Sequence, residues 1–245
     1  MEKNQESKYF NEYNIKLDEM HNKYLEHGGR RRVLNSLMEF SYVANDGQLV
    51  LDVGGDEIHN EEYHINFKEL FTTCHNLDYH YINQDSCDAR YDTFPYVDNK
   101  FDIVMSHECI EHLWNFREDG MMDYDGILHF WKESYRVLKP GGTFLISTRN
   151  RNCPMAFSRL KRGYPLMVSI CSLEMDLGSH AQELAASDFV AIVDKTKLFE
   201  DYEMYSIPSH HFPYQDAFRK KMEDFWEREL EDHELYDTLF FKGTK

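Results

Sequence analysis

The feature that most constrains the fold is an alternation of apolar runs and a helix-length segment between residues 101 and 148. Residues 101–106 (Phe-Asp-Ile-Val-Met-Ser) and 143–148 (Thr-Phe-Leu-Ile-Ser-Thr) are short apolar runs, which predicts two buried strands. Residues 123–138 are expected to form a helix between them, and Pro140-Gly141-Gly142 supplies a chain reversal before the second strand. Strands that alternate with helices predict an α/β domain with a mostly parallel, doubly wound sheet.

The rest of the chain extends this pattern in both directions. Residues 48–55 form an apolar run that ends in two glycines, which predicts a buried strand that enters a tight turn. Further strands are expected at about 71–78, 79–85 and 238–241, and further helices at 107–115 and 180–193. The 245 residues, 42% of them hydrophobic, are enough for one such core, so we expect a single domain that spans residues 1–245.

Three segments do not fit the minimal α/β unit. Residues 1–45 carry apolar side chains at helical spacing, which predicts a helical N-terminal segment that covers the domain as a lid. Residues 149–179 and 205–234 are candidate insertions on the substrate side, because ligands of open α/β sheets bind beyond the carboxyl ends of the strands. The apolar stripe of the helix expected at 215–234 indicates either core packing or a homodimer contact.

Charge and composition narrow the classes of partner and the compartment. The net charge of −17 repels phosphate backbones and therefore disfavours a nucleic-acid partner. The five cysteines are odd in number and form no Cys-x-x-Cys pair, so neither a disulfide framework nor a zinc–thiolate site is supported. No run approaches the roughly 20 apolar residues that cross a bilayer, and the N-terminus has no signal-peptide core. We therefore expect a cytoplasmic protein that does not associate with a membrane.

Three motifs in the order expected for one family resemble the class I S-adenosylmethionine (SAM) dependent methyltransferases, in particular those with a type 11-like methyltransferase domain. They are Asp52-Val53-Gly54-Gly55, the run from Phe94 to Ser106 followed by Glu111-His112, and the run from Arg136 to Gly142. The resemblance covers about residues 49–150. It implies a Rossmann-like fold, with a mostly parallel seven-stranded sheet and helices on both faces. The first motif departs from the family's usual Gly-x-Gly-x-Gly, because Gly55 is followed by Asp56-Glu57.

The resemblance also implies which residues bind SAM. Asp52, Gly54 and Gly55 match the first motif and would face the methionine part of the cofactor. Asp78 would hold the ribose hydroxyls, and Asp85, with Ser86 beside it, would approach the adenine amino group. Asp85 is also the alternative ribose ligand, and either carboxylate could instead lie in a surface loop. Ser106 and His107 follow a strand at the point where the family's chain passes the cofactor.

Glu108, Glu111 and His112 are spaced so that one face of a helix would carry all three side chains. Two carboxylates and an imidazole can bind a divalent cation (Mg²⁺, Mn²⁺ or Zn²⁺) or act as an acid–base group. Similar sequences serve as metal ligands in small-RNA 3′-end 2′-O-methyltransferases and in ubiquinone-pathway O-methyltransferases, where a later histidine, here His180, can complete the set. Three hypotheses therefore stay open: a metal site, a metal-free catalytic group of Glu111, His112 and His180, and a purely structural motif.

The function that the resemblance implies is transfer of a methyl group from SAM to an oxygen of a small polar acceptor, such as a sugar or glycan precursor in carbohydrate biosynthesis. Two alternatives remain. One is a 3′-end RNA 2′-O-methyltransferase, against which the net charge of −17 argues. The other is a methyltransferase-like domain that binds or scaffolds without catalysis, which the shortened glycine motif favours.

Overall fold

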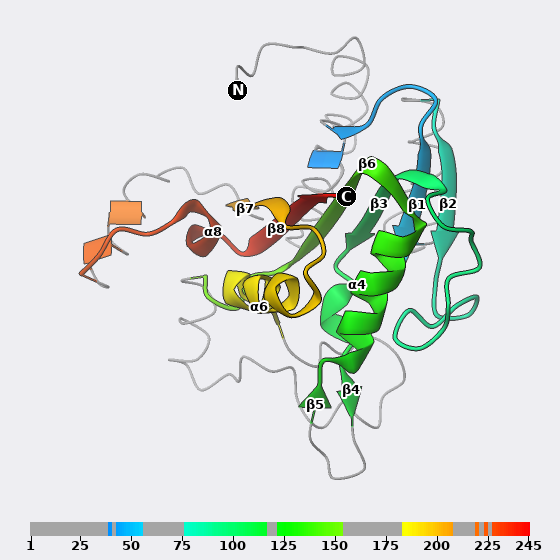
Figure 1. Cartoon of the computed structure of the whole chain (residues 1–245). Helices are drawn as coiled ribbons and strands as arrows, with labels where there is room; N and C mark the ends of the chain where they lie inside the picture. Colours follow the sequence, from blue (N-terminus) through cyan, green and yellow to red (C-terminus); the bar gives the residue numbers. More distant parts are fainter. Residues whose placement is uncertain are drawn as a thin grey trace, which may run out of the picture.

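The computed structural model describes residues 39–40, 43–55, 76–116, 122–153, 183–207, 219–220, 223–224 and 227–245 (Figure 1). The elements in chain order are β1 (Leu49–Val53), β2 (Asp78–Ile82), β3 (Phe101–His107), a 3₁₀ turn (Ile110–His112), β4 (Asn115–Phe116), β5 (Met122–Asp123), α4 (Asp125–Val137), β6 (Leu138–Arg149), α6 (Ala186–Thr196), β7 (Asp201–Ile207), α8 (Asp232–Leu235) and β8 (Thr238–Thr244). Within these residues, no helix is long and apolar enough to span a bilayer.

Six of the strands form one sheet in the order β2-β1-β3-β6-β8-β7. β2, β1, β3 and β6 are parallel, whereas β8 runs antiparallel to both of its neighbours, β6 and β7. β4 and β5 form a separate antiparallel pair. The expected α/β class with a largely parallel sheet is therefore confirmed, with six sheet strands in the part of the chain that the structure describes.

Both faces of the central strands β1, β3 and β8 are buried, which explains why these strands are largely apolar, whereas the outer strands β2 and β7 are partly exposed and more polar. On one face, Trp131 of α4 and Phe189 of α6 pack against Phe144 of β6 and Phe241 of β8. On the other face, Phe40 lies among a second set of buried side chains. Along each strand, these side chains alternate with those that point to the first face. They are Val50, Leu77, Tyr79, Ile103, Met105, Leu145 and Phe240.

The structure corrects several of the expected elements. Instead of two strands at 71–78 and 79–85, the described part of this region contains the single strand β2, which begins at Asp78. The helix expected at 107–115 is wrong: β3 continues through His107, Glu108 has a φ of +48°, and only one 3₁₀ turn follows. α6 begins at Ala186 rather than 180, and the residues before 183 lie outside the described ranges.

Tertiary pairing explains the remaining differences. β6 begins at Leu138 and continues to Arg149, because β3 and β8 provide hydrogen-bonding partners on its two sides. The first residues of the insertion expected at 205–234 belong to β7, which is an edge strand paired with β8. Half of that region, most of 149–179 and nearly all of the predicted N-terminal lid lie outside the described residues, as do His210 and His211.

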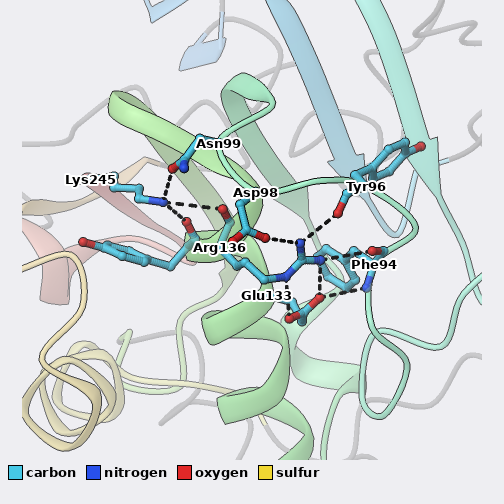
Figure 2. A network of polar contacts seen from close by, with 8 residues as sticks. Phe94, Tyr96, Asp98, Asn99, Glu133, Arg136 and Lys245 are labelled. Atoms are coloured by element: carbon cyan, nitrogen blue, oxygen red, sulfur yellow. Dashed lines mark hydrogen bonds and ion pairs between the residues drawn. The ribbon is translucent and has the colours of Figure 1, made fainter.

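Arg136, near the end of α4, joins the loop before β3 to the helix (Figure 2). Its guanidinium donates to the backbone oxygens of Phe94 and Tyr96 at 3.0 and 2.8 Å, and it pairs with Asp98 at 2.8 Å and Glu133 at 2.7 Å. Burial opposes ionisation of Glu133, but hydrogen bonds from Arg136 and from the backbone N–H of Phe94 outweigh this effect and lower its pKa. Arg136 therefore clamps the loop through three separate residues.

Lys245, the last residue of the sequence, closes the same corner of the domain (Figure 2). Its ammonium group donates to Asn99 at 2.7 Å and to the backbone oxygen of Tyr135 at 2.8 Å. Because Asn99 lies just before β3 and Tyr135 lies near the end of α4, these contacts hold the amino ends of the central strands. The network thus stabilises the amino ends of the strands, whereas ligands of α/β proteins bind at the opposite, carboxyl ends.

Candidate active site

The four parallel strands end at a common edge of the sheet, called here the carboxyl edge. Gly54 follows β1, Asn83 follows β2, Glu108 follows β3 and Asn150 follows β6. In open α/β sheets, ligands bind outside this edge. The carboxyl edge is therefore the candidate active site, and the predicted site residues can be compared with it.

The turn after β1 requires both of its glycines. Gly54 has a φ of +86°, and its N–H donates to the Ile82 oxygen at 2.8 Å, which joins the turn to the end of β2. A Cβ at Gly54 would lie 2.5 Å from the Cys109 sulfur, and a Cβ at Gly55 would lie 2.5 Å from Asp52 Oδ2. This backbone packs too closely against its neighbours for any side chain, so both positions require glycine.

Asp52 lies beneath this turn with only 2% of its surface exposed. Its Oδ2 accepts a hydrogen bond of 2.8 Å from the Tyr79 hydroxyl of the adjacent strand β2. Burial raises the pKa of Asp52 to about 7, although the bond from Tyr79 acts in the opposite direction. A carboxyl group that titrates near neutrality at the carboxyl edge is a marker of a functional site.

Asp52 makes stability depend on pH. The folded protein holds this proton up to a pH of about 7, whereas the unfolded chain releases it near 3.8, so the free energy of unfolding should fall as pH rises between these values. At about 1.4 kcal/mol per pKa unit, the loss is on the order of 4 kcal/mol. Urea unfolding at pH 5 and pH 8 should show a smaller loss for Asp52→Asn than for the wild type. Equal losses would contradict the assignment.

Asp78 does not lie where a ribose ligand is needed. It begins β2 opposite Leu49, so it stands at the amino end of the strand, about 13 Å from the carboxyl edge at 3.3 Å per residue. Its side chain is 68% exposed and lies 3.4 Å from His80 Nε2. The prediction that Asp78 ends its strand is therefore wrong, and the ribose role inferred from that position loses its support, because Asp78 is the first residue of β2 and not the last.

Asp85 and Ser86 do lie at the carboxyl edge, in the turn after β2. The Ser86 hydroxyl accepts from the Asn83 N–H at 3.0 Å, and the Ser86 N–H donates to Asn83 Oδ1 at 3.2 Å. Ser86 thus closes the turn, and the exposed Asp85 sits inside it. Of the two aspartates considered for the ribose, Asp85 is the one on the correct edge.

Ser106 and His107 hold the ends of neighbouring strands together. The Ser106 hydroxyl donates to the Val53 oxygen of β1 at 2.9 Å, and His107 Nδ1 lies 3.1 Å from the Ser147 hydroxyl of β6. Both residues are buried. Their side chains therefore fix the relative positions of β1, β3 and β6 where the cofactor is expected.

Glu108, Glu111 and His112 are not arranged on one face of a helix. Glu111 is completely buried, and its Oε2 accepts a hydrogen bond of 2.7 Å from the Thr148 hydroxyl of β6. Glu108 Oε2 lies 3.9 Å from Arg149 Nε. Because the two carboxylates are directed to different partners, no group of three candidate ligands in the described residues could hold a metal ion. His180 lies outside those residues.

The bond from Thr148 to Glu111 should contribute measurably to stability. Thr148→Val keeps the shape of the side chain but removes the hydroxyl donor, which is expected to lower the free energy of unfolding by about 1–3 kcal/mol. Thr148→Ser keeps the hydroxyl and serves as the control. Urea unfolding measures both variants, and equal stabilities for Val and Ser would show that the bond contributes nothing.

The structure adds four residues to this edge that the sequence did not indicate. Arg149 lies 3.8 Å from Glu183, and the Asn150 amide donates to the backbone oxygens of His233 and Tyr236, both at 2.8 Å. Arg149 and Asn150 directly follow the predicted strand 143–148, so their position could have singled them out. Tyr79 and Glu183 could not have been found, because only strand pairing and chain return bring them to the site.

Comparisons with known proteins agree with this arrangement. Residues 64–146 match a family model described as a methyltransferase domain. Over 57 residues, 23% of this chain, the sequence is 40% identical to a Mycolicibacterium smegmatis protein named "Probable S-adenosylmethionine-dependent methyltransferase". That match spans only 18% of the length of the mycobacterial protein.

Two solved structures show the same fold. A SAM-dependent methyltransferase from Archaeoglobus fulgidus has a TM-score of 0.52 and 14% identity, covering 87% of this chain and 94% of its own. Phosphoethanolamine N-methyltransferase 2 of Haemonchus contortus, in complex with phosphomonomethylethanolamine and S-adenosylhomocysteine, has a TM-score of 0.50 and 17% identity, covering 86% of this chain and 52% of its own. These likenesses show that the chain has the Rossmann-like fold of class I SAM-dependent methyltransferases, and that residues 64–146 within it match a methyltransferase domain.

Proposed function

We propose that this protein transfers a methyl group from SAM to a hydroxyl oxygen of a small polar acceptor, such as a sugar or a glycan precursor. The observation that carries the proposal is the Gly54–Gly55 turn, which packs against Cys109 and Asp52 at the carboxyl edge with no room for a side chain. Such a turn lets the backbone approach the methionine part of SAM. The family match over residues 64–146 supports the same cofactor.

In this reaction the protein mainly has to align the acceptor oxygen with the methyl group of SAM. The acceptor oxygen forms a bond to the methyl carbon while the carbon–sulfur bond breaks, the sulfur keeps that electron pair, and the hydroxyl proton passes to a base. Holding the oxygen, the methyl carbon and the sulfur in line supplies most of the acceleration. We assign the base to His112, which is partly buried on the 3₁₀ turn after β3, with Glu111 behind it fixed by Thr148.

The acceptor is proposed to carry no phosphate. Glu108 and Glu183 flank Arg149 at the carboxyl edge, and Glu111 is buried nearby on the adjoining turn, so carboxylates outnumber the arginine in this group. The net charge of −17 acts in the same direction at longer range. Both features favour neutral acceptors over phosphorylated ones and over RNA.

Isothermal titration calorimetry with SAM tests the cofactor, and release of S-adenosylhomocysteine (SAH) tests turnover. We expect micromolar binding of SAM, and SAH release with hydroxylated sugars but not with their phosphate esters. No heat of binding with several hundred micromolar SAM would refute the proposed function. Binding of SAM without turnover across sugars, polyols and amines would instead support the alternative of a non-catalytic binding domain.

A further inference from the structure

We propose that Asp52, held by Tyr79, is the residue with which this site distinguishes the cationic cofactor SAM from its product SAH. This inference rests on the proposed function and concerns the same site. SAM and SAH carry identical amino, carboxyl, ribose and adenine groups, and they differ in the methyl group and in the positive charge of the sulfonium. A residue that discriminates between them must therefore respond to one positive charge.

The carboxyl group of Asp52 is placed to do so. Alternation along β1 puts Asp52 on the same face of the sheet as Val50, directly beneath the turn, where a Cβ at Gly55 would lie 2.5 Å from Oδ2 and 2.6 Å from Cγ. The carboxyl therefore packs directly against the turn that is proposed to approach the methionine part of SAM. Tyr79 fixes Oδ2 from the neighbouring strand at 2.8 Å.

The described neighbours of Asp52 include no cation. On β2, the residues beside it are Tyr79 and Tyr81, and on β3 its register partner is the apolar Met105. The loop after β3 contributes the thiol of Cys109, whose pKa is raised to about 12 by burial and then by Glu111, so it is uncharged near neutral pH. Within the described residues, no lysine, arginine or histidine pairs with this carboxylate, and a bound cation would be its counter-charge.

Burial of an unpaired carboxylate is costly, and a nearby positive charge offsets that cost. In the transfer step, the methyl carbon leaves the sulfur with the acceptor, the sulfur keeps the bonding pair, and its charge changes from +1 to zero. SAH keeps the ammonium group that SAM also carries, so the product leaves the carboxylate of Asp52 with one positive charge fewer in the site. Ionised Asp52 strengthens SAM binding relative to SAH binding and so favours release of the product, whereas protonated Asp52 does neither.

Calorimetry with SAM and with SAH, each at several pH values between 5.5 and 8.5, tests the inference. Because the pKa of Asp52 is about 7, its ionised fraction rises about tenfold between pH 6 and pH 8. We expect the ratio of SAM affinity to SAH affinity to rise by about the same factor. At pH 6.5, SAM but not SAH should release a proton on binding, detected as a dependence of the heat on the ionisation enthalpy of the buffer.

Three variants test whether the pH dependence of the affinity ratio arises from Asp52 and Tyr79. Asp52→Asn should make the affinity ratio independent of pH. Tyr79→Phe removes the bond that lowers the pKa of Asp52, so the midpoint of the pH profile should move to a higher pH, a change that a purely structural role would not cause. Tyr81→Phe is the matched control: Tyr81 lies beside Tyr79, with ring centroids 6.3 Å apart, and the midpoint should not move.

The outcomes separate the two proposals. If the wild type binds both SAM and SAH with a ratio that does not change with pH, the inference fails while the proposed function stands. An affinity ratio that still depends on pH in Asp52→Asn also overturns the inference. If the wild type binds neither molecule, the proposed function fails and the inference fails with it. Should Asp52→Asn not fold, the wild-type profile and the shift in Tyr79→Phe still decide.

Discussion

Gly54→Ala should weaken SAM binding about 100-fold or more and lower the free energy of unfolding by about 2–4 kcal/mol. The new Cβ would meet the Cys109 sulfur at 2.5 Å, and the φ of +86° is one that alanine adopts only with strain. Both effects push the turn away from the end of β3, where the cofactor is proposed to bind. Calorimetry with SAM and urea unfolding measure the two losses.

Gly47→Ala is the matched control for this prediction. Gly47 has a similar φ of +75°, but a Cβ there would meet no atom within 4 Å. This variant should lose only the conformational contribution, about 1 kcal/mol, and should bind SAM as the wild type does. If Gly54→Ala binds SAM normally, the turn is not part of the cofactor site. If Cys109→Ala partly restores Gly54→Ala, the contact with the sulfur is the cause.

Arg136→Met should lower the free energy of unfolding by about 3–5 kcal/mol, because it breaks a largely buried ion pair and leaves the remaining partners unmatched. The substitution removes the hydrogen-bond donors to the backbone oxygens of Phe94 and Tyr96 (Figure 2). The Glu133 carboxylate, whose side chain is 12% exposed, then keeps only the hydrogen bond from the Phe94 N–H among these contacts. Methionine retains most of the aliphatic packing, so the change reports mainly on the polar contacts. Urea unfolding measures it.

Arg228→Met is the matched control for the clamp. Arg228 also pairs with a glutamate, Glu234, at 2.7 Å, but its side chain is 51% exposed. Solvent screens an exposed pair and its long side chains lose freedom in forming it, so this variant should be nearly as stable as the wild type. Equal losses in Arg136→Met and Arg228→Met would mean that the clamp has no special role in the fold.

The recognisable motifs lie at two opposite ends of the strands and have different physical roles. The run from Arg136 to Gly142 and the loop from Phe94 to Asp98 meet at the amino ends of the strands, where they hold the sheet together. The glycine turn and the residues after β3 meet at the opposite edge, where binding and chemistry are proposed. A motif can therefore identify the fold while lying far from the reaction.

The sequence predicted the parts of the fold that depend on local pattern. The strand predicted within 48–55, the strand at 101–106 and the helix at 123–138 are present because their apolar residues follow one period and are bounded by turn residues. The helix expected at 107–115 failed because Glu108 takes a left-handed φ and its neighbours pair with β6 instead. Similarly, the error in β2 reversed the edge on which Asp78 lies.

The sequence by itself determined the fold class, the turn at Gly54 and Gly55, and the resemblance to class I methyltransferases, since each depends on residues close together in the chain. Only the tertiary structure decided which side chains meet. Strand register brings Tyr79 to Asp52, the return of the chain before α6 brings Glu183 to Arg149, and Thr148 of β6 donates a hydrogen bond to Glu111, which the sequence spacing had grouped with candidate metal ligands. The physical reason is that hydrogen bonds between side chains on different strands depend on pairing and burial, and neither quantity is encoded in local spacing.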